Sequence, residues 1–237
     1  MKKNESVMGC DPIIKWAGGK RQLLSVIKER MPEEYGTYYE PFFGGGALFF
    51  ELQPKKAVIN DFNSQLVNMY QQIKKDHMAV LAIVDKYQKE YNELESAEQK
   101  SEYYYNRRKD FNTFLSSGEK NETSAALFIF LNKSAFNGVY RVNKSGEFNV
   151  PSAKRETINA YQLNNVKAVA ECLGRATILN GDFEAACQGA EAGDFVFFDS
   201  PYYDTFDTYQ AGGFDEDSMR MPTRGWRNCL RSSLIGE

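Results

Sequence analysis

A glycine-rich segment between two short apolar stretches constrains the fold of this chain more than any other feature of its sequence. Residues 38–43 have the composition of a strand, three glycines follow at 44–46, residues 47–52 begin a helix, and residues 56–62 form a second apolar stretch. A strand, a tight turn, a helix and a second strand in this order are typical of a βαβ unit. The sequence therefore predicts an α/β fold.

The rest of the chain predicts a main domain interrupted by an inserted lobe. Further helices are predicted from the spacing of apolar residues at 22–30, 66–109, 123–131 and 158–173. Further strands are predicted at 176–183 and 194–199, with a β-hairpin at 139–150 that turns at 143–146. Because the block 66–154 breaks the alternation of strands and helices, we predict that it is inserted into a main domain made of 1–65 and 155–237.

The composition limits the class of protein. With 237 residues, 42% of them hydrophobic, the chain can bury a sizeable core. No apolar run resembles a membrane span or a signal peptide, so we expect a cytoplasmic protein. The four cysteines include no CxxC pair and His77 is the single histidine, which argues against a disulfide framework, a metal site and catalysis by histidine.

Charge is unevenly distributed along the chain. The net charge of −3 does not by itself indicate a nucleic-acid-binding protein. Residues 133–155, however, carry five basic side chains and one acidic side chain, interleaved with aromatic residues. This segment is compatible with a DNA-facing loop and equally with a solvated hairpin.

The glycine turn has the character of a nucleotide cradle, since glycines between a strand and a helix let a ligand approach the backbone. Phe49 replaces the third glycine of the dinucleotide fingerprint, and the segment 18–20 lacks the flanking residues of a P-loop, which disfavours NAD and ATP. Asp61 follows Gly44 by 17 residues, close to the spacing of an acid that binds ribose hydroxyls. An adenosyl compound such as S-adenosylmethionine is favoured, although an ordinary turn with an exposed aspartate stays open.

The segment 197–202 (FFDSPY) delivers an acid, a proline and an aromatic ring to the end of an apolar strand. Asp199 could accept a hydrogen bond from an exocyclic amine, the carbonyl of Ser200 could accept a second, and Tyr202 could stack on a base. The same letters also occur at an ordinary exit from a strand into a turn. The function of this motif can therefore be inferred only together with the other motifs of the chain.

Five blocks of the sequence together resemble one family, the Dam-type (D12 class) DNA adenine N6-methyltransferases, including the GATC-modifying enzymes. In chain order they are 15–20 (KWAGGK), 40–49 (EPFFGGGALF), 60–63 (NDFN), 137–151 (NGVYRVNKSGEFNVP) and 197–202. The resemblance covers about 13–217. It implies a Rossmann-like S-adenosylmethionine-dependent methyltransferase fold, with the inserted helical and hairpin lobe as the target-recognition region.

The resemblance also implies roles for individual residues. Those expected to bind S-adenosylmethionine are Trp16, Lys20, Phe43, Gly44, Gly46, Asp61, Asp182 and Asp199. Those expected to form the catalytic motif are Asp199, Ser200, Pro201 and Tyr202. Those expected to contact DNA are Asn137 and Arg141 at base edges and Lys144, Lys154 and Arg155 at phosphates.

The implied reaction moves a methyl group to N6 of adenine in duplex DNA, at GATC, after the base has flipped out of the helix. A monomer, double-stranded DNA as partner and no metal are expected. Whether such an enzyme works in restriction–modification, in repair or for a phage stays open. A small-molecule or RNA methyltransferase is disfavoured by the block 137–151.

Two departures from the family pattern weaken the expected activity. The family motif reads Asp-Pro-Pro-Tyr, and Ser200 stands in place of its first proline, which adds backbone freedom to the motif. Only 35 residues follow Tyr202, and residues 218–237 contain four arginines and no lysine. We expect a truncated or frameshifted end with strands missing, or else a divergent tail. The alternative function is an inactive remnant that binds DNA without turnover.

Overall fold

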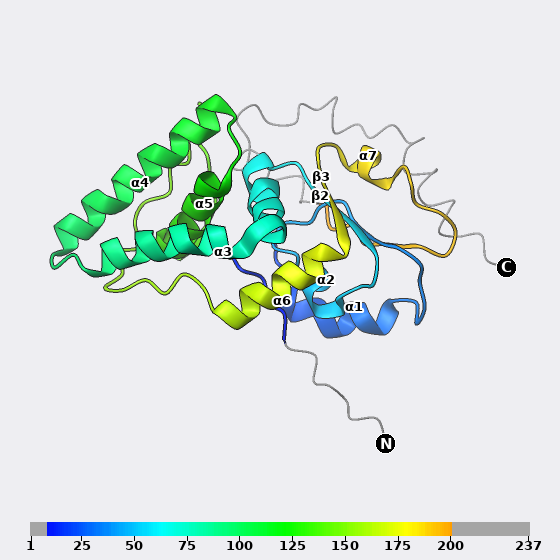
Figure 1. Ribbon diagram of the computed structural model, residues 1–237. Helices are drawn as coiled ribbons and strands as arrows, with labels where there is room; N and C mark the ends of the chain where they lie inside the picture. The colour runs from blue at the N-terminus through cyan, green and yellow to red at the C-terminus, as the bar shows by residue number, and fades with distance from the viewer. Residues whose placement is uncertain (1–8, 201–237) are drawn as a thin grey trace, which may run out of the picture.

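The computed structural model of the chain describes residues 9–200, which form a parallel sheet flanked by helices (Figure 1). The four strands are β1 (Tyr38–Glu40), β2 (Ala57–Asp61), β3 (Ala176–Asn180) and β4 (Phe195–Val196). Their order is β3-β2-β1-β4, and each neighbouring pair is parallel. The predicted α/β fold is confirmed. The predicted loss of strands near the carboxyl end concerns positions outside the described residues.

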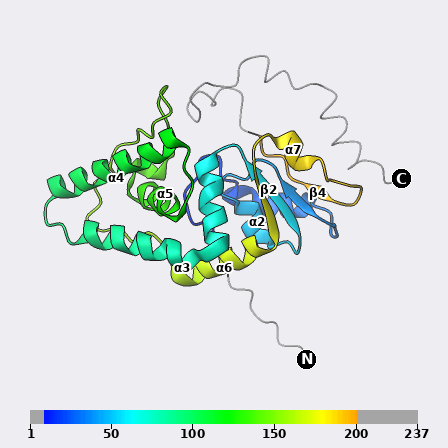
Figure 2. The ribbon, with the colours of Figure 1, turned by 45° about the horizontal axis from the view of Figure 1, so that its top comes forward.

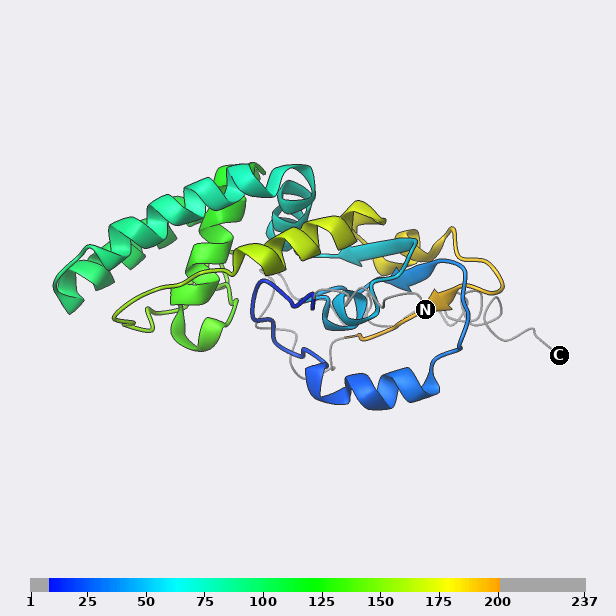
Figure 3. The same ribbon diagram turned by 60° about the horizontal axis from the view of Figure 1, so that its bottom comes forward.

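Helices cover both sides of this sheet. They are the 3-10 turn η1 (Arg21–Leu23), α1 (Leu24–Arg30), α2 (Ala47–Leu52), α6 (Leu163–Gly174) and α7 (Phe183–Cys187). Figure 3 shows α6, in yellow-green, on one side of the strands and α1, in blue, on the other. Within residues 9–200 there is no helix whose length and apolar character would let it cross a membrane.

All four strands are shorter than the sequence predicts, β2 by one residue at each end. β1 ends at Glu40 because Pro41, which follows, has no N–H to donate to a neighbouring strand. β3 ends at Asn180, since Gly181 adopts a φ of 152° and Asp182 then caps α7. β4 pairs over Phe195–Val196 alone, although the Phe197 N–H still donates to the carbonyl of Tyr39 at 2.8 Å.

Helix α6 begins at Leu163, so the helix predicted from 158 onward is wrong over its first residues. The side chain of Asn92 accepts from the N–H of Ile158 at 2.8 Å and donates to its carbonyl at 2.9 Å. The Ala160 N–H donates to the side chain of Gln88 at 3.1 Å. These contacts satisfy the backbone in an extended path, which competes with helix formation.

The block between β2 and β3 contains α3 (Ser64–Asn92), α4 (Ala97–Ser117) and α5 (Glu122–Ser134); it is helical as predicted, but the stretch predicted at 66–109 is divided into two helices. Helix α3 is kinked at Asp76, whose backbone leaves the helical region and whose side chain caps the N–H of Ala79. Figures 1 and 2 show the second half of α3, α4 and α5 as a lobe beside the sheet. The boundaries 66 and 154, and the role of the lobe in DNA recognition, stay predictions.

The segment after α5 is an irregular loop and contains no β-strand, in contrast to the predicted hairpin. After η2 (Phe136–Gly138), the predicted turn at 143–146 does form, because the Gly146 N–H donates to the carbonyl of Asn143 at 2.9 Å. Only isolated bridges join Val142 to Phe148 and Ala135 to Ser152. Side chains of α4 instead bind backbone groups of Phe148 and Val150, which fastens the loop to that helix.

Aromatic residues of α4 contribute to the core of the lobe. Tyr104 is fully buried, Tyr103 is half-buried, and Tyr105 lies largely at the surface. The three consecutive tyrosines therefore contribute to packing to different degrees. Among the described residues, Cys10, Cys172 and Cys187 are buried.

Candidate functional site

Four loops leave the sheet at one edge, because all four strands run in the same direction. Glu40 ends β1, Asp61 ends β2, and Asp199 lies just beyond β4. The order of the strands reverses between β1 and β4, and open α/β sheets bind ligands at the carboxyl ends of strands beside such a reversal. The three acidic side chains therefore gather where this type of fold holds its ligand.

The glycine turn between β1 and α2 is closely covered by aromatic side chains. Gly44 and Gly46 have φ values of 51° and 68°, which favour glycine. A Cβ added to Gly44 would lie 2.7 Å from Cδ1 of Trp16, and one added to Gly46 would lie 2.4 Å from Cζ of Phe43. Trp16, Gly44 and Gly46, all predicted cofactor residues, thus lie together, with no space for a side chain on the turn.

Phe43 also belongs to this turn, but its ring points into the core. The ring is 4% exposed and packs edge-on against Phe49, Phe50 and Tyr70, with ring centroids between 5.0 and 5.8 Å apart. The Phe43 N–H donates to the carbonyl of Asn60 at 2.8 Å, which joins the turn to β2. The structure therefore gives the ring of Phe43 a packing role and leaves its backbone at the turn.

Asp61 braces the glycine turn from the end of β2. Its Oδ2 accepts from the Gly44 N–H at 2.8 Å, and its Oδ1 accepts from the Asn63 N–H at 2.8 Å. Burial raises the pKa of Asp61, although these backbone donors partly offset the effect. Each carboxylate oxygen can accept a further hydrogen bond. The bracing of the turn is thus compatible with a second use of the same carboxylate.

Lys20 and Asp199 come from distant parts of the chain and form an ion pair. Nζ of Lys20 lies 2.6 Å from Oδ1 of Asp199, and it also donates to the carbonyl of Gly18 at 2.9 Å. Both side chains are largely buried, 18% and 23% exposed. The structure thus joins the block that contains Trp16 to the block that ends β4. Ser200 is described and exposed, whereas the predicted catalytic residues Pro201 and Tyr202 lie outside the described residues.

Asp182 lies at the exposed start of α7. Its Oδ1 accepts from the Glu184 N–H at 2.7 Å, which is the contact of a helix cap. This cap explains the residue locally, and its predicted contact with the adenine end of the cofactor stays a prediction.

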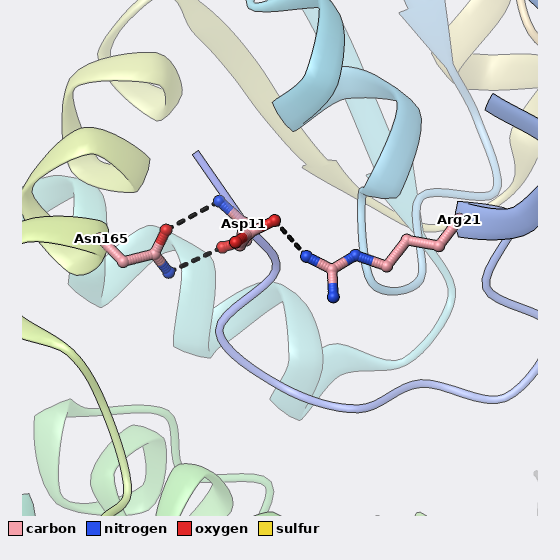
Figure 4. A network of polar contacts seen from close by, with 3 residues as sticks. All are labelled: Asp11, Arg21 and Asn165. Atoms are coloured by element: carbon pink, nitrogen blue, oxygen red, sulfur yellow. Dashed lines mark hydrogen bonds and ion pairs between the residues drawn. The ribbon is translucent and has the colours of Figure 1, made fainter. Parts of the chain in front are cut away.

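Two amide side chains fasten the N-terminal segment that carries Trp16 and Lys20. Asn165 on α6 accepts from the Asp11 N–H at 2.7 Å and donates to its carbonyl at 2.9 Å, while Asp11 also pairs with Arg21 (Figure 4). Asn132 on α5 accepts from the Lys15 N–H and donates to the carbonyls of Lys15 and Gly138, each at 2.9 Å. Asn132 thereby connects the N-terminal segment to the start of the irregular loop.

All five predicted DNA-contacting residues are exposed on or beside the irregular loop. They are Asn137, Arg141, Lys144, Lys154 and Arg155. The Nε of Arg141 donates to the side chain of Asn149 at 2.8 Å, which holds the guanidinium across the loop. The loop itself is anchored by α4, since Asn112 accepts from the Phe148 N–H at 2.8 Å and donates to its carbonyl at 3.2 Å.

An aromatic stack joins the loop to the N-terminal segment. The ring of Tyr140 stacks on Trp16, with centroids 5.5 Å apart and an interplanar angle of 24°. Burial raises the pKa of Tyr140 to about 12, and a hydrogen bond with Asn63 at the start of α3 partly opposes the shift. The same tryptophan therefore contacts both the glycine turn and the loop. The sequence analysis predicted Trp16 but not Tyr140, whose block showed it as one aromatic residue among several.

Sequence analysis also missed a cluster of cations next to the loop. Lys133 on α5 is half-buried, and its ammonium makes no hydrogen bond or ion pair within the described residues. Burial lowers its pKa, and the neighbouring charges of Lys15 and Arg155 lower it further. The three cations come from separate segments, so only the fold reveals their proximity. We call Lys15, Lys133 and Arg155 the cation cluster.

The comparisons with known proteins agree with these features. Residues 16–231 match the family described as D12 class N6 adenine-specific DNA methyltransferase. The chain is 38% identical over 228 residues to the type II methyltransferase M1.LlaDCHI of Lactococcus lactis subsp. cremoris, across 93% of this chain and 76% of that protein. It is 39% identical over 229 residues to the type II methyltransferase M.MjaIII of Methanocaldococcus jannaschii, across 90% and 78% of the two chains.

A DNA adenine methylase of Haemophilus influenzae is 31% identical over 193 residues, across 81% of this chain and 63% of that protein. The matched segments include the glycine turn, the irregular loop and the end of β4. The chain therefore belongs to the D12 class of N6 adenine-specific DNA methyltransferases, which depend on S-adenosylmethionine.

Proposed function

We propose that this protein methylates N6 of adenine within GATC in duplex DNA, and that the target base leaves the helix to reach Asp199. The observation that carries the proposal is the ion pair between Lys20 and Asp199, because it joins the predicted cofactor block to the predicted catalytic block beside the glycine turn. Support for GATC comes from the block 137–151, which resembles the GATC-modifying enzymes.

The residues at the glycine turn fit S-adenosylmethionine. A turn on which no Cβ can be accommodated suits close contact between the backbone and a ligand. The side chains next to it include the carboxyl groups of Glu40, Asp61 and Asp199 together with the ammonium of Lys20. A site with three carboxyl groups and one ammonium suits a positively charged sulfonium nucleoside better than a pyrophosphate. Trp16 and Lys20 would contact the cofactor, and Asp61 would bind its ribose hydroxyls.

The chain's own residues have three tasks in the reaction. S-adenosylmethionine supplies an electrophilic methyl group when it is bound. Asp199, which pairs with Lys20, would accept a hydrogen bond from N6 of the flipped adenine, and the carbonyl of Ser200 would accept the second. These two acceptors would direct the nitrogen lone pair toward the methyl group, and most of the rate enhancement would come from this positioning. The nitrogen must lose a proton as it gains a carbon, and Asp199 would receive it.

DNA recognition would take place at the irregular loop and the cation cluster. The terminal nitrogens of Arg141 make no hydrogen bond within the described chain, so they can reach O6 and N7 of a guanine in the major groove. Asn137 would assist at the base edges. Lys144, Lys154 and the cation cluster would neutralise backbone phosphates, so binding should weaken steeply with salt.

The test is transfer of labelled methyl groups to three duplexes that differ only at the target. One contains GATC, the second contains the same bases rearranged to GTAC, and the third contains GATC already methylated at N6. We expect label in N6-methyladenine from the first duplex alone. Equal labelling of the GTAC duplex would exclude the proposed recognition site. The Asp199→Asn variant should lose at least about a hundredfold in rate, whereas the surface variant Asp110→Asn should match the wild type.

Base flipping has its own measurement. A duplex with 2-aminopurine at the target adenine should become more fluorescent when the protein binds, because unstacking relieves quenching of the base. The same probe placed outside GATC should stay quenched. A target probe that also stays quenched while binding is demonstrated would exclude flipping.

Ser200 gives a reason to separate turnover from binding. If the wild type binds the GATC duplex but transfers no label, the chain is a binding remnant. If it transfers label slowly, we expect the Ser200→Pro variant to be faster by up to about a hundredfold, since proline restores a fixed φ to the motif. A variant no faster than the wild type would show that Ser200 is tolerated.

A further inference from the structure

Glu40 is a buried carboxyl group at the edge of the sheet where the strands end, next to the glycine turn that is proposed to hold the cofactor. It ends β1 immediately before the glycine turn, and the residue is 4% exposed. Its Oε2 accepts from the hydroxyl of Tyr38 at 2.7 Å, and the backbone N–H of Phe49 also donates to the carboxyl group. No lysine or arginine pairs with Glu40 within the described residues. A buried carboxyl group without a cation is costly in its ionised form.

The charged and titratable groups around Glu40 come from several elements, and most of them oppose its ionisation. Asp199 beyond β4 and Asp61 at the end of β2 act on it as negative charges, while Tyr38 on β1 and Tyr70 on α3 face it as buried phenols. The ammonium of Lys20 pairs with Asp199, at 2.6 Å, and not with Glu40. Burial, followed by these negative charges, raises the pKa of Glu40 to about 8, although Tyr38 and Phe49 favour its ionised form. The carboxyl group is therefore mainly protonated near pH 7.

A cation next to this group would reverse that balance. S-adenosylmethionine carries a sulfonium charge that its thioether product lacks, so the cofactor and the product differ by one positive charge at the same position. A buried carboxyl group feels such a difference strongly, since the effective dielectric around it is low. The opposite charge favours the ionised form of the carboxyl group.

We propose that Glu40 is a specificity-determining residue. It releases its proton when the sulfonium cofactor binds at the glycine turn, and it takes up a proton again when the neutral thioether product remains. The ionised carboxylate stabilises the bound cofactor, and the protonated form leaves the product without an attractive counter-charge. Glu40 thereby favours exchange of product for fresh cofactor. The inference rests on the proposed placement of the cofactor at the glycine turn, and it does not depend on methyl transfer or on the DNA sequence that is recognised.

The proton release can be counted by titration calorimetry in two buffers that differ in their enthalpy of ionisation. At pH 7 we expect close to one proton to be released when S-adenosylmethionine binds and close to none when S-adenosylhomocysteine binds. The sign of the pH dependence follows from this release. Affinity for S-adenosylmethionine should rise with pH up to the pKa of the free protein, so its preference over the product should grow about tenfold between pH 6.5 and 8.5.

Two variants keep the proposal open to refutation. Glu40→Gln retains an acceptor for Tyr38 but cannot ionise, so its release of protons and the pH dependence of its preference should both disappear. Tyr38→Phe removes a hydrogen bond that favours the ionised form, so the midpoint of the preference should move to higher pH.

Equal proton release for the two ligands, or a Glu40→Gln variant that retains the wild-type pH dependence, would overturn the proposal. Failure of S-adenosylmethionine to bind at all would overturn it together with the proposed cofactor site. Binding with proton release but without methyl transfer to DNA would uphold Glu40 and refute the proposed methylation.

Discussion

The glycine turn and the irregular loop at 139–155 are held in place in two different ways. The turn depends on its own backbone, because glycines with positive φ lie beneath aromatic rings that leave no space for a side chain. The loop depends on side chains that come from another element, since Asn112, Tyr104 and Arg108 of α4 bind its backbone groups at 148 and 150.

This difference predicts how each region responds to change. The turn has no free volume for a side chain, so a single added methyl group should disrupt it. The loop is held by hydrogen bonds from several donors, so the loss of one donor should be partly compensated by the others. Trp16 and Asn132 connect the two regions and should transmit damage to both.

The largest effect is expected at the turn. In Gly46→Ala the new Cβ would lie 2.4 Å from Cζ of Phe43 and 2.9 Å from Cε2 of Phe50, both in the packed core. Overpacking and a left-handed φ of 68° should together lower the free energy of unfolding by about 3–4 kcal/mol. Urea denaturation measures this loss, and calorimetry should show a parallel loss of affinity for S-adenosylmethionine in the folded fraction.

Gly118 offers a matched control for this substitution. It follows α4 with a φ of 71°, and a Cβ added there would meet no atom within 4 Å. Gly118→Ala should therefore report the backbone cost alone, about 1 kcal/mol. Equal losses in the two variants would mean that close packing at the turn contributes nothing, and the proposed contrast with the loop would fail.

A smaller effect is expected at the connection between the two regions. Asn132 is 5% exposed, and Asn132→Leu conserves its approximate volume while leaving Lys15 and Gly138 without their partner. We expect a loss of about 2–3 kcal/mol in the free energy of unfolding, since backbone groups lose hydrogen bonds. Affinity for both the cofactor and DNA should fall, because the amide fixes both segments.

The control for Asn132 is another buried asparagine, whose hydrogen bonds reach neither the N-terminal segment nor the irregular loop. Asn68 on α3 is 1% exposed and donates to the carbonyl of Asn121 at 3.0 Å and to the hydroxyl of Ser124 at 2.9 Å. Asn68→Leu should destabilise the protein by a similar amount while the folded protein keeps its ligand affinities. If Asn132→Leu behaves in the same way, the two regions are not connected through this amide.

The same contrast explains which parts of the molecule could be predicted from the sequence. The turn could be predicted because its determinants are contiguous: a strand, three glycines, a helix and an acid at a fixed distance. Lys20 and Asp199 could be predicted to share a site only through a resemblance to a family, since 179 residues separate them in the sequence and nothing local links them.

The irregular loop was harder to predict, because its partners lie elsewhere in the chain. The alternation in 139–150 predicted a hairpin, but pairing is limited to a single bridge between Val142 and Phe148, and the outward-facing backbone groups of Phe148 bind the amide of Asn112 on α4. The cation cluster escaped detection for the same reason, since Lys15, Lys133 and Arg155 meet only in the fold. Local signals therefore predict contiguous sites well and sites assembled from distant segments poorly.

The smallest effect is expected in the loop. The hydroxyl of Tyr104 donates to the carbonyl of Val150 at 2.8 Å, and Arg108 donates to the same carbonyl at 3.2 Å. In Tyr104→Phe the carbonyl keeps one donor, so the free energy of unfolding should fall by only about 1 kcal/mol. Urea denaturation measures this change, and affinity for the GATC duplex should fall slightly while affinity for S-adenosylmethionine stays constant.

Tyr105, the next residue on the same helix, isolates the contribution of that one hydroxyl. Its side chain is 40% exposed, and its hydroxyl makes no hydrogen bond within the described residues. Tyr105→Phe should therefore change the free energy of unfolding by less than about 0.5 kcal/mol. A loss at Tyr104 as large as that at Gly46 would mean that the loop has no compensating donors. The two regions would then be held with equal stringency, and the contrast drawn between them would be wrong.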